Sequence, residues 1–396
     1  MKYATIFAIW IALAVILLCS FPAATAAQNA SAALAASTAK EQTNIPGVKI
    51  FADRPAGFSP LTATDEQLST YGLPPRPDKQ ADPQGYAQWA RAMTSLKYRA
   101  SATLVAKPYS STNLKLVNNQ ANQPSVQVNG APTQYYSTNW SGVANTNNLT
   151  KWNDNTSFNY IQSITTVPAA QPPFGACWNP TNGPFLTAVW NGIDGANNGD
   201  VLQGGSLSYA DCNGDTLQSG QYIGWVEWYP SYSILEIVCG AGKAPPPCPV
   251  YPGDNFLVIT FGAPGTANQY VYVEDGTEGW YGSFELAWQQ GPGLVGSSAE
   301  WIVERPCCIT VGTEEDPVPL ANYISQAVSN SFSSKGNGNV FFPGSQAAST
   351  WVIDMLDDNA DQIISDVEGQ GTAGLQGKTS LWLEATGCAF AGGCTP

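Results

Sequence analysis

The sequence predicts an all-β fold beyond about residue 135, a lectin-like sandwich of two antiparallel sheets. Short runs of alternating apolar and polar residues recur in this part, Gly, Pro, Asn and Asp separate them, and no long helical pattern intervenes. The strongest strand candidates are residues 222–229, 256–261, 270–274, 280–288 and 300–304. The turn-forming residues 275–279 predict a hairpin between the third and fourth of these strands.

An apolar segment precedes the predicted sandwich at the start of the chain. It begins after Lys2, extends to about Phe21 and is followed by the small residues Ala24-Thr25-Ala26. This pattern predicts that residues 1–26 are a secretory signal peptide, and hence a secreted, extracellular protein with no membrane contact once the signal is removed. A retained membrane anchor is the alternative, because the run approaches the ~18 residues that span a bilayer.

Eight of the nine cysteines lie beyond the predicted signal, an even number that predicts disulfides in an exported protein. Cys239 and Cys248, and likewise Cys388 and Cys394, are close enough in sequence to close small loops, whereas residues 307–308 are an adjacent pair. The spacing does not decide the connectivity, because eight cysteines allow about 105 arrangements.

Residues 27–135 form a leader whose charge is opposite to that of the rest of the chain. The first 135 residues contain 11 of the 16 basic residues but 6 of the 30 acidic ones, so the predicted sandwich domain, residues 136–396, is strongly acidic. In the leader, residues 64–67 form a capping box that predicts a short helix, and residues 84–96 predict a second one. Residues from about 107 to 134 are rich in Asn, Gln, Ser and Pro and predict a linker.

The absence of histidine restricts the chemistry. Ser-His-Asp and Cys-His mechanisms and His-ligated metal sites are excluded, and we expect neither a metal nor another cofactor. The net charge of −14 argues against nucleic acid as a partner, because binding phosphates takes clustered Lys and Arg. Carboxylates and amides are therefore the candidate catalytic groups.

Two candidate carboxylates lie on predicted strands that are rich in tryptophan. Glu227 lies within residues 222–229, where the period of two puts it on the same face as Trp225. Glu304 ends another predicted strand and shares its face with Glu300. For either side chain alone, a surface carboxylate on a strand is the simpler interpretation.

Two further candidates lie next to glycines. Asp194 follows Trp190 by four residues and precedes Gly195, and Gln203 precedes two glycines. Neither pattern is specific by itself, but the order of all these segments along the chain is informative.

Five segments, taken in order, resemble those of the glutamic peptidases, or eqolisins, a family of secreted endopeptidases that act in acid. The matching segments are Asn139–Gly142, Trp190–Gly195, Leu202–Gly205, Glu227–Pro230 and Ala299–Glu304. The resemblance spans about residues 135–396, and the leader segment 71–78 also looks like leaders of bacterial relatives.

The resemblance implies a β-sandwich with a catalytic glutamine–glutamate dyad. The catalytic glutamine of the family falls on Gln203, and its catalytic glutamate falls on Glu304 rather than Glu300. The positions that match substrate-binding or supporting residues of the family are Trp190, Asp194, Glu227 and Trp140.

We therefore expect an endopeptidase that hydrolyses polypeptide substrates. Ionised Glu304 would take a proton from water and return it to the leaving amine, and the Gln203 amide would donate to the oxyanion. A carboxylate base with an ordinary pKa near ~4 suits acid. Acid operation also fits the few basic residues of the domain, because protonating its carboxylates leaves little charge to cause self-repulsion.

The leader would make this protein a zymogen. Its charge predicts that it binds the acidic domain near neutral pH as an intramolecular inhibitor and leaves in acid. Its predicted contact residues are Arg76, Lys79, Arg91, Lys97 and Arg99. We expect the protein to be a monomer.

Two alternative functions follow from the same patterns. A carbohydrate-binding, lectin-like sandwich would use its tryptophans to stack on sugar rings, and a glycosidase would use paired carboxylates. The pairing of Glu304 with a glutamine instead of a second acid favours the peptidase.

Overall fold

The structure is a computed structural model that describes residues 40–385 apart from several short segments. The segments outside the description are 81–82, 118–131, 174–175, 179–182, 213–221, 241–244, 263–267, 292, 312–313, 324, 344–348, 361 and 371–380. The predicted signal peptide and the Cys388/Cys394 pair therefore lie outside the described residues.

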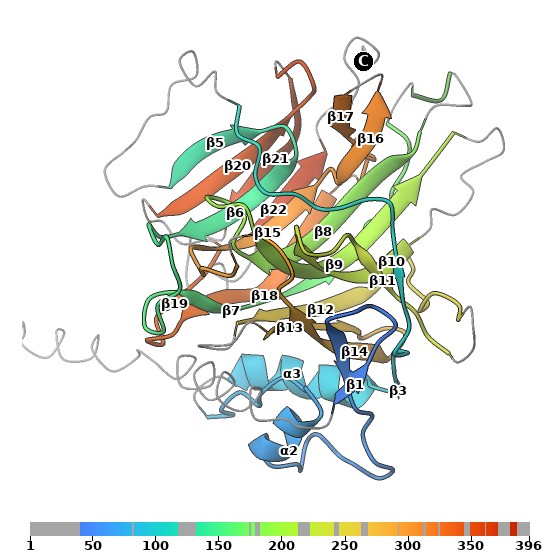
Figure 1. The fold of residues 1–396 in the computed structure, drawn as a ribbon, viewed down its shortest axis with the longest axis vertical. Coiled ribbons are helices and arrows are strands. Elements are labelled where there is room, and N and C mark those ends of the chain that lie inside the picture. Colours follow the sequence, from blue (N-terminus) through green and yellow to red (C-terminus); the bar gives the residue numbers. More distant parts are fainter. Residues whose placement is uncertain are drawn as a thin grey trace, which may run out of the picture.

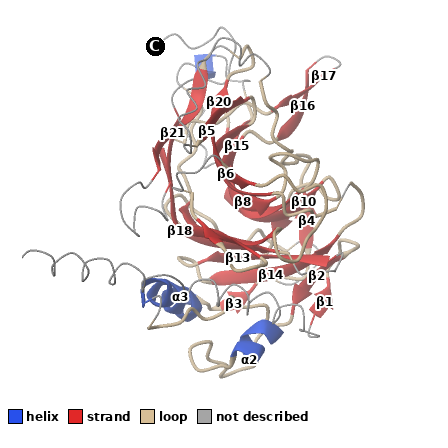
Figure 2. Cartoon of the chain, turned by 90° about the vertical axis from the view of Figure 1, so that its left-hand side faces the viewer, coloured by secondary structure: helices blue, strands red, loops and turns tan. Residues whose placement is uncertain are grey.

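Two curved β-ladders pack on one another as a sandwich (Figures 1 and 2). The first ladder, sheet I, runs in spatial order through β5 (Thr133–Ser137), β20 (Thr350–Leu356), β6 (Trp140–Thr146), β15 (Ser298–Glu304), β8 (Phe185–Ile193), β9 (Val201–Ala210), β10 (Tyr222–Tyr229), β11 (Leu235–Ile237) and β4 (Leu104–Ala106). All of these pairs are antiparallel except that of β20 with β5.

The second ladder, sheet II, is antiparallel along its whole main run. It passes through β21 (Ile363–Gln370), β22 (Leu381–Ala385), β18 (Ser325–Lys335), β7 (Phe158–Thr166), β12 (Asn255–Phe261), β13 (Asn268–Asp275), β14 (Trp280–Ala287), β2 (Val48–Phe51) and β1 (Lys40–Gln42). Pairing of β20 with β21 joins the two sheets. Smaller strands are β3 (Tyr98–Arg99) beside β14, β19 (Val340–Phe341) beside β18, and the separate pair β16 (Cys307–Val311) and β17 (Glu314–Pro317).

The alternation along each strand divides its side chains between two apolar cores. On β10, Val226 and Trp228 pack between the sheets against β12 and β13, whereas Trp225 belongs to a cluster on the opposite face of sheet I. On β15, Trp301 and Val303 point into the sandwich while Ile302 lies on that opposite face. Glu227 and Glu304 follow the second pattern by their place in the alternation, which confirms the faces predicted from the sequence.

The predicted elements agree closely with the structure. The five predicted strands correspond to β10, β12, β13, β14 and β15, and residues 275–279 join β13 to β14. The capping box starts helix α2 (Asp65–Thr70), because the Gln67 amide donates to the Thr64 hydroxyl and the Thr64 amide donates to the Gln67 side chain. The second predicted helix is α3 (Pro83–Ser95).

The leader differs most from expectation. Its strands β1, β2 and β3 are part of sheet II, and β4 is part of sheet I. Its helices α2 and α3 lie under the outer face of sheet II (Figures 1 and 2). Short strands of two to four residues carry too little alternation to be recognised in the sequence. Residues 107–117 of the predicted linker are also bound to the domain by main-chain hydrogen bonds.

Three disulfides lie among the described residues: Cys177–Cys212, Cys239–Cys248 and the vicinal pair Cys307–Cys308. The first of these closes a loop that the sequence spacing did not single out. Within residues 40–385, as far as they are described, no helix is long and apolar enough to cross a membrane.

Candidate active site

Strands β9, β10 and β15 of sheet I, with β8 between β15 and β9, carry polar side chains that lie close together beside tryptophan rings. Gln203 on β9 stands directly opposite Glu227 on β10, and Glu304 ends β15 opposite Ala188 on β8. All three polar side chains are fully buried. The register places Gln203 beside Glu227, and the charge of Glu304 acts on Glu227, so residues about a hundred positions apart lie in one region.

The Gln203 amide is oriented by its neighbour. Its Nε2–H donates to Glu227 Oε2 at 3.0 Å. Gln203 Oε1 and Glu227 Oε1 are both buried, and neither has a hydrogen-bond partner among the described residues. Two buried acceptors without donors are unusual in a folded protein and mark a place suited to a water molecule or to polar atoms of a substrate.

Glu304 is held from two sides. The Trp190 indole Nε1–H donates to Oε2 at 2.8 Å, and the backbone N–H of Thr112 donates to Oε1 at 2.9 Å. The Trp140 ring packs edge-on against Trp190, with centroids 4.9 Å apart. The tryptophans therefore fix the position of the carboxylate and exclude bulk water from it.

Glycines allow this close arrangement. A Cβ atom on Gly205 would lie 2.1 Å from the Val189 carbonyl oxygen and 2.8 Å from Trp190 Cβ, so only glycine fits beside the tryptophan. Gly195 has a φ of +105°, and a Cβ there would meet the Trp140 ring at 2.9 Å. These contacts explain two glycines of the matching segments.

Asp194 has a different position from the other matched acids. Its carboxylate accepts hydrogen bonds from the backbone amides of Val295, Gly296 and Ser297 and from the Ser297 hydroxyl. It thereby holds the loop that leads into β15. Its charge acts on Glu300, which is also fully buried, so the structure groups Asp194 with Glu300 rather than with Gln203.

Burial dominates the electrostatics of the site. It raises the pKa of Glu304 to about 8, although the hydrogen bonds from Thr112 and Trp190 act in the opposite direction. The pKa of Glu227 lies well above its usual range, first because of burial and second because of the charge of Glu304. The two carboxyl groups thus affect each other, and both favour the protonated form in this state.

Residues 107–117, here named the covering segment, run over this group of side chains. Figure 1 shows the segment, in turquoise, climbing beside β10 and β11 and then crossing sheet I towards β5. Its main chain exchanges hydrogen bonds with Cys307 through Ser110, at 2.6 and 2.7 Å, and with Ile234 through Lys107 and Tyr109. The segment is therefore bound through isolated bridges of main-chain hydrogen bonds.

Consecutive amides of the covering segment contact the two acids. The Ser111 N–H donates to Glu227 Oε2 at 3.0 Å, and the next N–H, of Thr112, donates to Glu304 Oε1. Beyond them, the Leu114 N–H donates to the Gly195 carbonyl at 3.0 Å. A peptide main chain therefore lies directly on the groups that the sequence pointed to.

Asn139 is a residue of the site that sequence reasoning did not single out. Its Nδ2 donates to the Thr112 hydroxyl and to the Asn113 carbonyl, each at 3.1 Å, and its Oδ1 accepts from the Lys115 amide. Its place in the first matching segment was the available signal. The backbone donors of Ser111 and Thr112 gave no signal, because every residue except proline carries an N–H.

Fold and site together define a class, a β-sandwich hydrolase whose reactive groups are carboxylates and an amide. Among the residues that the structure describes, no group of Cys, Asp or Glu side chains is arranged to hold a metal ion. Residues 138–376 match the peptidase A4 family, and the chain belongs to that family. It is thus a peptide-bond hydrolase, as predicted, and the sugar-binding and glycosidase alternatives are not supported.

Several solved structures are similar to this chain. Scytalido-glutamic peptidase, solved with a peptide-based transition-state analogue, is 19% identical, with 63% of this chain and 98% of that chain covered and a TM-score of 0.46. Aspergilloglutamic peptidase from Aspergillus niger is 20% identical, with 51% and 99% covered and a TM-score of 0.37. A comparison with curated proteins gives no match.

Proposed function

We propose that this protein is a secreted, acid-acting glutamic endopeptidase that is made as a zymogen, with Gln203 and Glu304 as its catalytic residues. One observation carries the proposal: successive main-chain amides of the covering segment donate hydrogen bonds to Glu227 and Glu304, beside the Gln203 amide. A polypeptide main chain therefore fits the site, with a titratable group at one of its nitrogen atoms.

The chemistry assigns a role to each group. Ionised Glu304 takes a proton from a water molecule that attacks the peptide carbonyl, and then gives the proton to the leaving nitrogen. The Thr112 nitrogen lies 2.9 Å from Glu304 Oε1, and we take its position as that of the leaving nitrogen of a substrate. Gln203 Nε2 donates to the oxyanion, a contact worth roughly 3–4 kcal/mol in comparable sites. Because an amide does not titrate, this donor works at any pH.

The state of Glu304 supports a zymogen. A sequence-based pKa near ~4 does not describe the covered site, where burial raises the pKa of Glu304 to about 8. A protonated Glu304 cannot accept a proton from water at acid pH. Removing the covering segment admits water and removes part of the desolvation, which lowers the pKa towards its ordinary value and restores the base.

Export is supported by separate features. Residues 1–26 have the pattern of a signal peptide, and disulfides such as Cys177–Cys212 and Cys239–Cys248 form where thiols are oxidised. The acidic domain with few basic residues suits an acidic medium.

The test uses the full chain with denatured casein and a quenched fluorescent peptide near pH ~3–4, below and around the ordinary carboxylate pKa. We expect Gln203→Ala and Glu304→Gln each to abolish cleavage while the circular dichroism spectrum stays unchanged. Glu66→Gln, at an exposed position of α2, is the control and should cleave normally. Normal cleavage by a folded Glu304→Gln variant would overturn the proposal and direct attention to Glu300 or Glu227.

A further inference from the structure

We propose that residues 40–106, here named the leader body, stay bound to the sandwich domain as a permanent non-covalent subunit after the chain is cut, and that only the covering segment leaves. The proposal rests on the proposed function, because it concerns the fate of the leader when the zymogen matures. The family match begins at residue 138 and does not include the leader body.

The main chain of the leader body is part of both sheets. β2 pairs with β14 from Val48 opposite Leu286 to Ile50 opposite Phe284, and β4 pairs with all of β11. Between these strands, the amides of Lys97 and Ala100 donate to carbonyls at the β14 end of sheet II, at 2.7 and 2.8 Å. Ladder hydrogen bonds of this kind do not depend on ionisable side chains, so acid leaves them intact.

The leader body also completes the core between the sheets. Val48 and Ile50 of β2, together with Ala100 and Leu104, are at most 1% exposed and belong to the same apolar cluster as Trp228 of β10. β10 carries Glu227, so the leader body supports the strand behind the candidate site. Its loss would open this core to water, which opposes dissociation.

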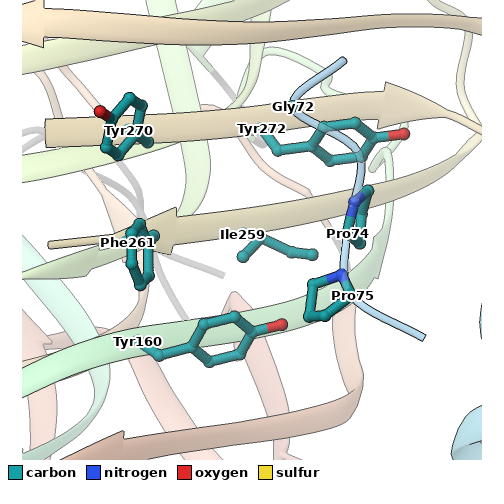
Figure 3. Close-up of a pocket in the computed structure, with 8 residues that line it drawn as sticks. All are labelled: Gly72, Pro74, Pro75, Tyr160, Ile259, Phe261, Tyr270 and Tyr272. Atoms are coloured by element: carbon teal, nitrogen blue, oxygen red, sulfur yellow. The ribbon is translucent and has the colours of Figure 1, made fainter. Parts of the chain in front are cut away.

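A second apolar contact covers the outer face of sheet II. Leu68 of α2 and Trp89 and Met93 of α3 are buried in one cluster with aromatic side chains of β7, β12, β13 and β14. Figure 3 shows Pro74 and Pro75 of the connecting loop lying across these strands, around a small apolar cavity. The sheet residues that line this cavity are Tyr160, Ile259, Phe261, Tyr270 and Tyr272. Soluble monomers seldom expose a contiguous aromatic face of this kind.

Charge contributes less to the binding of the leader body than the sequence predicted. Arg76 donates to the Pro60 and Ala63 carbonyls, and Arg99 donates to the Phe51 carbonyl and pairs with Glu41, so both act within the leader body. Lys79 lies over the Tyr86 ring, also within it. Of the other predicted contacts, Lys97 donates to the Glu278 carbonyl.

The ion pairs between the leader body and the domain converge on one carboxylate. Lys40 and Lys49 both pair with Glu285, and Tyr270 and Asn268 also face this group. Burial alone would raise the pKa of Glu285, but the hydrogen bond and charge of Lys40 hold it below its usual value. Strong acid therefore removes this ion pair, while the ladders and both apolar contacts persist.

The covering segment is attached in a different way. Its main chain makes isolated bridges, with Cys307 of β16 and Ser137 of β5, rather than a continuous ladder. Its ion pair between Lys107 and Glu236 has a lysine side chain that is 23% exposed. Leu114 supplies its main buried apolar side chain. The segment can therefore leave while the leader body stays.

The experiment cuts the chain with an external protease, so that the cut does not depend on the chain's own activity. A recognition sequence for a specific external protease is placed within residues 118–131 of the Glu304→Gln chain, which is then cut completely at neutral pH. Size-exclusion chromatography and native mass spectrometry follow, at neutral pH and near pH 3, with and without 1 M salt. We expect both fragments to elute together under all four conditions. Separation of the fragments in acid or in salt would overturn the proposal, whatever the outcome of the activity assay.

Matched variants identify the contact that holds the fragments. Ile50→Asp places a charge in the shared core and should cause the cut fragments to separate, whereas Arg91→Ala, at an exposed position of α3, should leave them together. Circular dichroism of the uncut chains checks that each variant is folded. Where Ile50→Asp does not fold, Ile50→Ala gives a graded test, with partial separation expected in 1 M urea. If the fragments of Ile50→Asp or Ile50→Ala stay together as firmly as those of the parent, the core contact is contradicted.

Discussion

Glu227 accepts a hydrogen bond from Gln203 across the β9–β10 ladder, at 3.0 Å between Oε2 and Nε2. The bond determines which way the amide faces, since an amide rotated by half a turn would bring its oxygen against the carboxylate oxygen. Glu227 is thereby a positioning residue for Gln203, and it needs no contact of its own with the substrate to affect the rate.

The first prediction concerns this bond. In Glu227→Gln the two amides can pair in either direction, so a fraction of the molecules holds Gln203 reversed. An ordinary hydrogen bond contributes about 0.5–1.5 kcal/mol, so we expect kcat to fall roughly 2- to 10-fold with little change in KM. Steady-state kinetics on a quenched peptide measures both constants. An unchanged kcat would show that Gln203 is oriented by other contacts.

The second prediction concerns the covering segment. Thr112→Pro removes the N–H that donates to Glu304, whereas Thr112→Ala keeps it and loses the hydroxyl that accepts from Asn139. We expect the uncut Thr112→Pro chain to be roughly 2- to 10-fold more active than the uncut parent, because one hydrogen bond that holds the segment over the site, worth about 0.5–1.5 kcal/mol, is lost. The measurement is the initial rate, with mass spectrometry confirming that the chain is uncut. Equal activation by Thr112→Ala would assign the restraint to the side chain instead.

The third prediction concerns the pH dependence of stability. Burial raises the pKa of Asp200, Glu274 and Asp275 to about 7 each. The folded state then binds more protons than the unfolded state between pH ~4 and about 7, so the free energy of unfolding falls as the pH rises through this range. The contribution is complete below pH ~4 and is lost above about pH 7–8. Urea unfolding of the inactive Glu304→Gln chain at pH 4 and pH 8 measures the difference.

One of these carboxyl groups provides the matched variant. Glu274 is fully buried and accepts hydrogen bonds from Tyr272 and Ser95. Glu274→Gln removes its titration and should reduce the difference in unfolding free energy between pH 4 and pH 8 by up to about 3 kcal/mol. The exposed Glu66→Gln should leave the difference unchanged. A protein that is more stable at pH 8 than at pH 4 would show that other groups dominate.

The fourth prediction tests the glycine beside Trp190. In Gly205→Ala the new methyl group would meet the Val189 carbonyl at 2.1 Å, so β8 and β9 must move apart and Trp190 must shift away from Glu304. We expect a loss of about 1–3 kcal/mol in stability together with a large loss of activity. Gly199→Ala, where no atom lies within 4 Å of the new methyl group, should change neither. Melting temperature and peptide cleavage are the two measurements.

The sequence predicted the features that depend on regular alternation. Strand faces, the hairpin after Asp275 and the helix start at Thr64 all follow from local patterns that the sandwich preserves. The placement of Gln203 opposite Glu227 depends on ladder register, which no single segment encodes. The resemblance to a family indicated the residues, and the fold explains why they meet.

The covering segment and the leader strands could not be predicted in the same way. Residues 107–117 are polar and irregular, and they contact the site mainly through main-chain groups that are common to all sequences. β2 and β4 are short and gain their stability from the sheets that they extend. Tertiary context, rather than local pattern, decides both structures.

The place of β1, β2 and β4 at the ends of the two sheets has a consequence for the biogenesis of this protein. A domain synthesised without residues 40–106 would present the unpaired N–H and C=O groups of β11 and β14 to solvent, and such bare edges recruit strands from other molecules. By pairing with these edges, the leader body protects the protein from aggregation during folding, in addition to any part that it has in restraining activity.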